Sequence, residues 1–172
     1  TGKMWSHEHY GIKPDMVAFG KKTQICGFMC GPRIDDVKEN VFRVSSRLNS
    51  TWGGTLVDMV RSQRYLEIMA EERLLENAAA RGAELLLALE SMTKEFPAHV
   101  SGARGKGLMC AFDLKDGALR DAVINHAYEE GVVVIGCGSN SIRFRPSLAI
   151  SKAALAEGLE MLRASIKKAI AR

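Results

Sequence analysis

The feature that most constrains this fold is a helical pattern that runs through residues 54–96. Apolar side chains recur there at spacings of three and four, as one face of a helix requires. The phase of the pattern shifts near residues 70–72, and Pro97 ends it. We therefore predict two long helices, and two parts of the chain, 1–70 and 71–172, that meet within this stretch.

Shorter elements flank the helical stretch. Before it, we predict a loop with one helical turn closed by Pro14, a charged surface turn at 33–40, and brief strands at 16–19, 25–31 and 41–44. After it, we predict extended pieces at 100–102, 108–114, 132–135 and 141–145, turns at 104–107 and 136–140, and helices at 117–130 and 151–170. This order predicts an α/β protein that ends in a small α+β unit.

The composition, 47% hydrophobic and 26% charged, is typical of an ordinary globular protein. Residues 1–64 hold 10 basic and 6 acidic side chains, so the whole net charge of +4 lies in this part. A local positive surplus favours an anionic ligand such as a phosphate or a carboxylate. The sequence has no run of like charge and no basic-aromatic cluster, so we do not expect nucleic-acid binding.

The four cysteines, Cys26, Cys30, Cys110 and Cys137, form no CxxC pair and lack the spacing of zinc ligands. We therefore expect free thiols in a reducing cytoplasm and no metal site. No apolar run approaches the ~20 residues that span a bilayer, and no signal peptide opens the chain. The chain starts at Thr1 without an initiator methionine, so we expect it to be part of a longer protein.

A candidate for covalent chemistry follows the first predicted strand. The apolar run Met16–Phe19 indicates a buried strand, Gly20 breaks it, and Lys21 and Lys22 follow. A lysine held at the end of a buried strand is desolvated, which favours the neutral amine that can form a Schiff base. The alternative, favoured by this stretch alone, is a solvated pair of lysines that ends an edge strand.

A loop of small hydrogen-bonding residues, Asn49-Ser50-Thr51, precedes Gly53 and Gly54 and the first long helix. Exposed hydroxyls, backbone N–H groups and the positive end of a helix dipole are what a phosphate site requires. An ordinary helix N-cap would use the same residues, and the loop alone does not decide between the two interpretations.

Two arginines alternate along the last predicted strand. A period of two places Arg143 and Arg145 on one face, about 7 Å apart, while Ile142 and Phe144 point into a core. The fork of a guanidinium matches a carboxylate with two parallel hydrogen bonds. The strand therefore predicts a carboxylate site, and the alternative is an edge strand with solvated arginines.

Four motifs, in this order, resemble the class III aminotransferases, which use pyridoxal phosphate. They are Ala18–Gly27, Arg47–Gly54, Gly107–Phe112 and Ser141–Pro146. The first two are most similar to the lysine 6-aminotransferase subfamily, and the match spans essentially the whole chain. The resemblance implies fold type I: the end of a large domain, including two strands of its parallel sheet, followed by the small α+β C-terminal domain.

The resemblance also implies roles for particular residues. Lys21 would form the Schiff base with the cofactor and then move a proton as general base and acid; the family places this lysine directly after a glycine, which favours Lys21 over Lys22. Thr51 would bind the cofactor phosphate across the interface of a homodimer, and Ser50 would line the same site. Asn49 would contact the substrate.

Arg143 would grip the carboxylate of 2-oxoglutarate or glutamate, and that of lysine, while Arg145 would be structural or peripheral. The implied reaction moves the terminal amino group of L-lysine to 2-oxoglutarate. One alternative is an aminotransferase for 4-aminobutyrate or another ω-amino acid, which Gly136–Gly138 and Ser141–Pro146 also resemble. Another is a non-catalytic fragment that keeps only the fold and the dimer surfaces. Asp15, the obvious acid near Lys21, lies outside the family's position for the partner of the pyridinium nitrogen.

Overall fold

The computed structural model describes residues 1–51 and 53–171. The chain forms two compact units, one of residues 5–73 and the other of residues 1–4 together with the chain from Leu74 onward. Their assignment to the end of a large domain and a small C-terminal domain stays a prediction. Among the described residues, no helix combines the length and the apolar character needed to cross a membrane.

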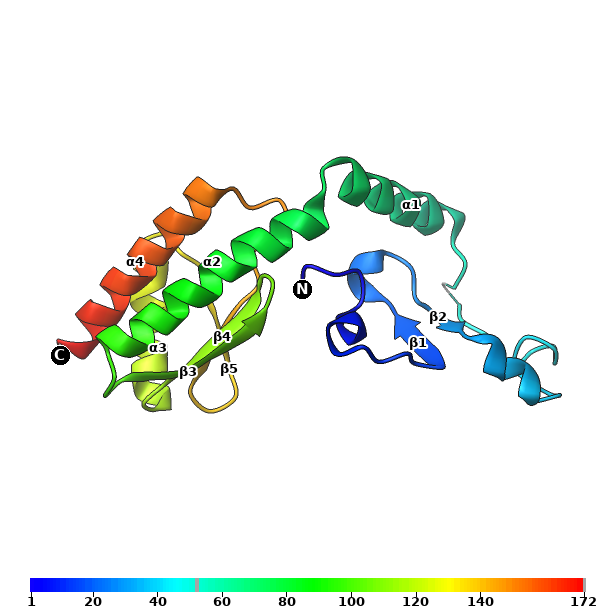
Figure 1. The fold of residues 1–172 in the computed structure, drawn as a ribbon, viewed down its shortest axis with the longest axis horizontal. Coiled ribbons are helices and arrows are strands. Elements are labelled where there is room, and N and C mark those ends of the chain that lie inside the picture. The colour runs from blue at the N-terminus through cyan, green and yellow to red at the C-terminus, as the bar shows by residue number, and fades with distance from the viewer. Residues whose placement is uncertain (52, 172) are drawn as a thin grey trace. The chain divides into compact units, whose positions relative to one another are not determined.

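Residues 5–73 contain two short strands and one long helix (Figure 1). The elements are η1 (Ser6–Tyr10), β1 (Met16–Phe19), η2 (Lys21–Thr23), β2 (Gly27–Cys30), η3 (Pro32–Asp36) and α1 (Leu56–Glu71). Strands β1 and β2 pair antiparallel, with Met16 opposite Cys30. The expectation of parallel strands is therefore wrong for this pair, which forms a hairpin. The strand predicted at 41–44 is also absent, since these residues form turns.

This unit has almost no interior of its own. Within the described part of residues 5–73, the only buried residue is Asn40. Strand β1 alternates between exposed and half-buried positions, and no residue of α1 is buried. The buried strand predicted at 16–19 is thus wrong for this chain, and the apolar face of α1 is exposed, because one hairpin and one helix do not cover each other's apolar side chains.

The unit from Leu74 onward packs three helices on a four-stranded sheet (Figure 1). Its elements are α2 (Leu74–Glu95), β3 (Val100–Lys106), β4 (Met109–Leu114), α3 (Gly117–Glu129), β5 (Ile135–Cys137), β6 (Ser141–Phe144) and α4 (Lys152–Ile170). The strand order is β3-β4-β6-β5, and every neighbouring pair is antiparallel. The predicted small α+β unit is confirmed.

The core of this unit follows the period-two alternation of its central strands. On β4, Cys110, Phe112 and Leu114 are buried, and on β6 the same holds for Ile142 and Phe144. These side chains meet leucines and other apolar residues of α2 and α4. The alternate residues of both strands therefore lie on the sheet face opposite the helices, and Arg143 is one of them.

The helix ends follow local signals in the sequence. Ser151, where the predicted helix 151–170 begins, caps α4, because its Oγ accepts a hydrogen bond from the Ala154 N–H at 3.1 Å. The two long helices separate at Arg73, where φ is 51°, slightly later than expected. Position 82, within α2, requires a glycine, because a Cβ there would come within 2.1 Å of the Gly107 backbone.

Candidate active site

Lys21 begins the 3₁₀ turn η2 directly after strand β1. Its φ is 58°, in the left-handed region that a residue with a side chain enters only when its surroundings hold it there. The Gln24 N–H donates to the Lys21 carbonyl at 3.0 Å, and the Thr23 hydroxyl donates to the Ile25 carbonyl at 2.7 Å. The backbone that carries Lys21 is therefore fixed by a closed turn.

The amine of Lys21 is exposed, and it makes no hydrogen bond or ion pair with residues 1–51 or 53–171. Residues 5–73 therefore do not supply the desolvation that was expected at the end of a buried strand. They leave the amine available to react, on a backbone of fixed geometry. Asp15, the nearest acid in sequence, is occupied by Arg33, whose Nη1 lies 2.7 Å from its Oδ2.

Asn49, Ser50 and Thr51 lie in an exposed loop just before α1. The Gly53 N–H donates to the Ser50 carbonyl at 3.2 Å, and Gly54 has a φ of 75°, so the chain turns tightly there. The three side chains make no hydrogen bonds with the other described residues. This arrangement offers two hydroxyls and a helix N-terminus to an anion. Trp52, part of the motif that suggested the site, lies outside the described residues.

One contact joins the lysine turn to the helix that follows the loop. Arg61 of α1 donates from Nη1 to the Gln24 Oε1 at 3.4 Å. No hydrogen bond or ion pair links Lys21 directly to Thr51 among the residues described in this unit. Arg143 belongs to the other unit.

Arg143 occupies the middle of β6, between Ala111 of β4 and Ile135 of β5. Its Nε is buried and has no hydrogen-bond partner among the described residues. Arg143 is also one of the residues around a cavity of about 170 Å³, whose other walls include apolar residues of 132–135 and of α4. A buried guanidinium atom without a partner can receive a carboxylate. Arg145 is exposed beyond the end of the strand and lines the same cavity.

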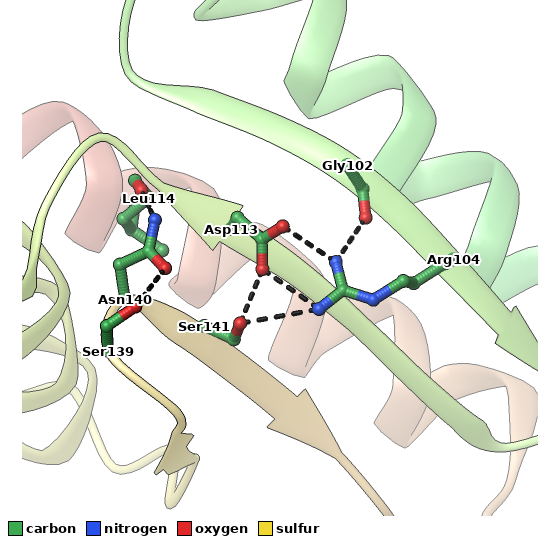
Figure 2. Close-up of polar contacts among 7 residues, drawn as sticks. All are labelled: Gly102, Arg104, Asp113, Leu114, Ser139, Asn140 and Ser141. Atoms are coloured by element: carbon green, nitrogen blue, oxygen red, sulfur yellow. Dashed lines mark hydrogen bonds and ion pairs between the residues drawn. The ribbon is translucent and has the colours of Figure 1, made fainter.

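A polar network, which the sequence did not reveal, lies on the same sheet face as Arg143 (Figure 2). Arg104 donates to both carboxylate oxygens of Asp113 at 2.9 Å, and to the Gly102 carbonyl at 2.7 Å. The Ser141 hydroxyl donates to Asp113 and lies 3.3 Å from Nη2 of Arg104. The Arg104 guanidinium and the Ser141 hydroxyl together hold the pKa of Asp113 below its ordinary value.

A sequence profile of the aminotransferase class-III family matches residues 1–166 of this chain. The chain belongs to the class-III aminotransferase family. Members of this family generally use pyridoxal phosphate. The aminotransferase fold of type I, inferred from four motifs, is thereby confirmed for this chain.

Curated relatives of this class-III chain include several L-lysine-epsilon aminotransferases. The chain is 48% identical to that of Amycolatopsis lactamdurans over 96% of its own length, and 46% identical to that of Mycobacterium tuberculosis. The mitochondrial 4-aminobutyrate aminotransferase of Rattus norvegicus is 38% identical over 86% of the chain. The chain spans 37% of the length of the first of these relatives.

The solved structure of lysine aminotransferase from M. tuberculosis matches 98% of the class-III chain with a TM-score of 0.93 and 45% sequence identity. The chain covers 39% of that structure. An ω-transaminase from Thermomicrobium roseum also matches, with a TM-score of 0.85 and 30% identity. The two compact units therefore have the folds that the corresponding parts of class-III aminotransferases have.

Proposed function

We propose that this chain is part of a pyridoxal-phosphate aminotransferase that moves the terminal amino group of L-lysine to 2-oxoglutarate. The observation that carries the proposal is the gradient of similarity. Identity to L-lysine-epsilon aminotransferases is 46–48% over 96% of the chain, whereas identity to 4-aminobutyrate aminotransferases is 37–38% over 86%. Relatives that share a substrate are more often similar over their whole length, so the higher identity over more of the chain favours the lysine donor.

The residues present fit the proposed cofactor. Lys21 offers a free amine on a strained, fixed backbone, which suits a Schiff base to the aldehyde of pyridoxal phosphate. Thr51 and Ser50 offer exposed hydroxyls just before α1, which suits the phosphate. When bound, the cofactor supplies an electron sink for the substrate carbon.

The chain's own residues would then perform the remaining steps. Lys21, once released by the substrate amine, would take the proton from the substrate carbon and return it as general base and acid. Arg143 would hold the substrate carboxylate through its guanidinium fork, and Asn49 would line the substrate site. Because both L-lysine and 2-oxoglutarate carry a carboxylate, a single guanidinium serves both halves of the exchange.

The proposal includes a homodimer in which Thr51 of one subunit serves the cofactor of the other. It is consistent with the exposed position of the loop that carries Thr51 and with the exposed apolar side chains Leu56, Val57 and Val60 of α1. A helix with this much apolar surface gains stability when a partner covers it. The proposal also places the enzyme in the cytoplasm, where its four free thiols would stay reduced.

Two alternatives make different predictions. An enzyme for 4-aminobutyrate or another ω-amino acid would use the same lysine and arginine with a different donor. A non-catalytic fragment would keep the fold but would not form a specific Schiff base. The division of the chain into the end of a large domain and a small domain is shared by all three.

The first test is borohydride reduction of the chain after addition of pyridoxal phosphate, followed by peptide mass mapping. We expect an absorbance band near that of a Schiff base and a label on Lys21, retained in Lys22→Arg and lost in Lys21→Arg. A label spread over several lysines, or none, would indicate the non-catalytic fragment. Amine transfer by the full-length enzyme that carries this chain, with L-lysine and 4-aminobutyrate as competing donors, then separates the two catalytic alternatives.

A further inference from the structure

The sheet face opposite the helices carries two guanidiniums in one cross-strand row. Arg104 of β3 pairs with Ala111 of β4, and Ala111 pairs with Arg143 of β6. Directly paired residues point to the same face, and neighbouring strands lie about 4.8 Å apart. The two arginines are therefore about 10 Å apart at their Cα atoms, with only the small side chain of Ala111 between them.

The two guanidiniums have opposite surroundings. Arg104 is bound by both oxygens of Asp113 and by the Gly102 carbonyl (Figure 2). Arg143 has no ion pair with any residue of 1–51 or 53–171, and its Nε is buried without a partner. One arginine of the row is satisfied by residues of this chain, and the other has no charged partner among residues 1–51 and 53–171.

Asp113 is held in the orientation that satisfies Arg104. It lies directly opposite Ser141, whose hydroxyl donates to the same carboxylate oxygen that Nη2 of Arg104 contacts. The side chain of Asp113 is 29% exposed, against 53% for that of Arg104, so the carboxylate is partly screened from water. Since its pKa is held low by these partners, it stays ionised at neutral pH.

We propose that Asp113 is a positioning residue: it occupies Arg104 as an internal carboxylate and so directs the substrate carboxylate to Arg143. The inference rests on the proposed carboxylate-binding role of Arg143. A free guanidinium at Arg104 would offer the same fork to the same ligand, on the same face of the sheet as Arg143. Asp113 acts by removing this competitor and does not itself touch the substrate.

A purely structural role for Asp113 makes a different prediction, and a double variant separates the two. If Asp113 only ties β3, β4 and β6 together, Asp113→Asn weakens ligand binding at Arg143, and removing Arg104 as well does not restore it. If Asp113 keeps Arg104 occupied, Asp113→Asn opens a second binding position, and Arg104→Gln in addition closes it again.

The experiment follows the arginine Nε–Hε signals of the ¹⁵N-labelled 172-residue chain by NMR during titration with glutarate, a five-carbon dicarboxylate. In the wild type we expect the Arg143 signal to move with a Kd at least about tenfold lower than that of Arg104, because the ligand must displace the Asp113 carboxylate to reach Arg104. In Asp113→Asn we expect the Arg104 signal to move with a Kd within about threefold of that of Arg143, because neither guanidinium then has a carboxylate partner within the chain.

Two further variants complete the test. Asp113→Asn with Arg104→Gln should show glutarate binding at Arg143 with the wild-type Kd. Asp121→Asn removes the same charge beside Arg120 on α3, away from this face, and should leave both signals at wild-type behaviour. Should Asp113→Asn lose its folded amide spectrum, Asp113→Thr removes the charge with a residue suited to a strand and takes its place.

Each outcome decides between the proposals. If Arg143 responds in the wild type and Arg104 stays silent in the charge-removing variant, the inference is wrong and the proposed function stands. The inference is also wrong, and the proposed function again stands, if binding at Arg143 weakens and the double variant does not restore it. If Arg143 does not respond to glutarate even in the wild type, its proposed carboxylate role fails, and the inference falls with it.

Discussion

Two aromatic pairs with the same spacing lie in different surroundings in the two units. The rings of Phe112 and Phe144 are 5.4 Å apart, and so are those of Phe28 and Phe42. Phe112 is fully buried, whereas Phe42 is 58% exposed. A contact between two rings therefore does not by itself form a core. The contribution of the ring pair to folding stability depends on how far the surrounding residues bury it.

The two candidate site residues Arg143 and Lys21 differ in burial in the same way as the two aromatic pairs. Arg143 lies in a sheet whose other face is packed against three helices. Lys21 lies in a unit without a buried apolar residue among residues 5–51 and 53–73. The position of Arg143 is therefore fixed by a core, whereas that of Lys21 is fixed by the local hydrogen bonds of one turn.

Removal of the buried ring should have the largest effect. Phe112→Ala is expected to destabilise the unit from Leu74 onward by about 3–5 kcal/mol, because it leaves a cavity at the centre of the core. The matched change Phe28→Ala should cost less than about 1 kcal/mol, because its partner ring is largely in water. Urea unfolding followed by hydrogen exchange, read separately for residues 5–73 and 74–171, measures both.

Comparable losses for Phe112→Ala and Phe28→Ala would contradict the comparison. They would mean that residues 5–73 possess a core that their exposure does not reveal. Rapid amide exchange throughout strands β4 and β6 of the wild type would also contradict the comparison, because it would mean that the unit from Leu74 onward lacks a stable core.

Two glycines in helices provide the second test. Gly82→Ala should destabilise the chain by about 3 kcal/mol, because the new Cβ would overlap the Gly107 backbone and α2 would have to move. Gly158→Ala is the matched control in α4, where no atom lies within 4 Å of the added Cβ. It should stabilise by up to about 1 kcal/mol through helix propensity. Thermal unfolding of the two variants should therefore shift in opposite directions, and equal shifts would refute the close packing of α2 on Gly107.

The sequence predicted the elements that depend on regular patterns, and it failed where a side chain or a bulge controls the backbone. The long helices, the end of α3 near Gly131 and the cap at Ser151 follow from apolar period and capping chemistry. The strand predicted at 41–44 is replaced by turns because the buried Asn40 amide donates to the Ile34 and Val37 carbonyls and accepts from the Phe42 N–H.

Two boundary errors have similar causes. The register of β3 shifts between Ser101 and Arg104, and the strand continues to Lys106, into the turn predicted at 104–107. After α3 the Val132 N–H still bonds to the Ala127 carbonyl at 2.8 Å, which delays the strand predicted at 132–135 until Ile135. Neither a bulge nor a helix-end bond leaves a periodic signal in the sequence.

The candidate site was predictable to the same extent. The sequence placed Lys21 just after a strand and Arg143 within a strand, as the structure has them, and their roles, implied by the family resemblance, stay predictions. The pairing of Arg104 with Asp113 could not be predicted from the sequence. It depends on the strand register beyond the bulge, which places the two residues diagonally on neighbouring strands. Residue type alone gave no reason to join them.

The reactivity of one cysteine thiol in each unit, Cys110 and Cys26, tests the difference in packing between the units. Burial raises the pKa of the Cys110 thiol to about 11, whereas Cys26 is exposed. At pH 8 we expect Cys110 to react with an aromatic disulfide reagent at least about a hundredfold more slowly than Cys26, because little thiolate forms and access is blocked. Stopped-flow absorbance with peptide mapping assigns the rates. Similar rates at the two cysteines would show that β4 opens readily, against the proposed difference in packing.

The smallest expected effect concerns acid stability. The pKa of Asp113 is lowered by Arg104 and Ser141, so this carboxylate contributes stability that is fully present above its ordinary pKa of 3.8. The contribution is lost as the pH falls through the lowered pKa of the folded state. Relative to Asp113→Asn, the wild type should therefore be more stable by about 1 kcal/mol at pH 7, and the difference should shrink below about pH 4.

Asp15→Asn is the matched control for this acid effect in the other unit. Asp15 pairs with Arg33 at 2.7 Å, but their side chains are 58% and 73% exposed, so water screens the pair. A pair this exposed contributes little to stability, and its loss should change the unfolding free energy by less than about 0.5 kcal/mol at any pH. Urea midpoints measured between pH 3 and pH 7 distinguish the two pairs, because only the Asp113 difference should vary with pH. An equal pH dependence at Asp15 would mean that the hydrogen bonds around Asp113 add nothing beyond a surface ion pair, and the fixed orientation inferred for that carboxylate would have no energetic basis.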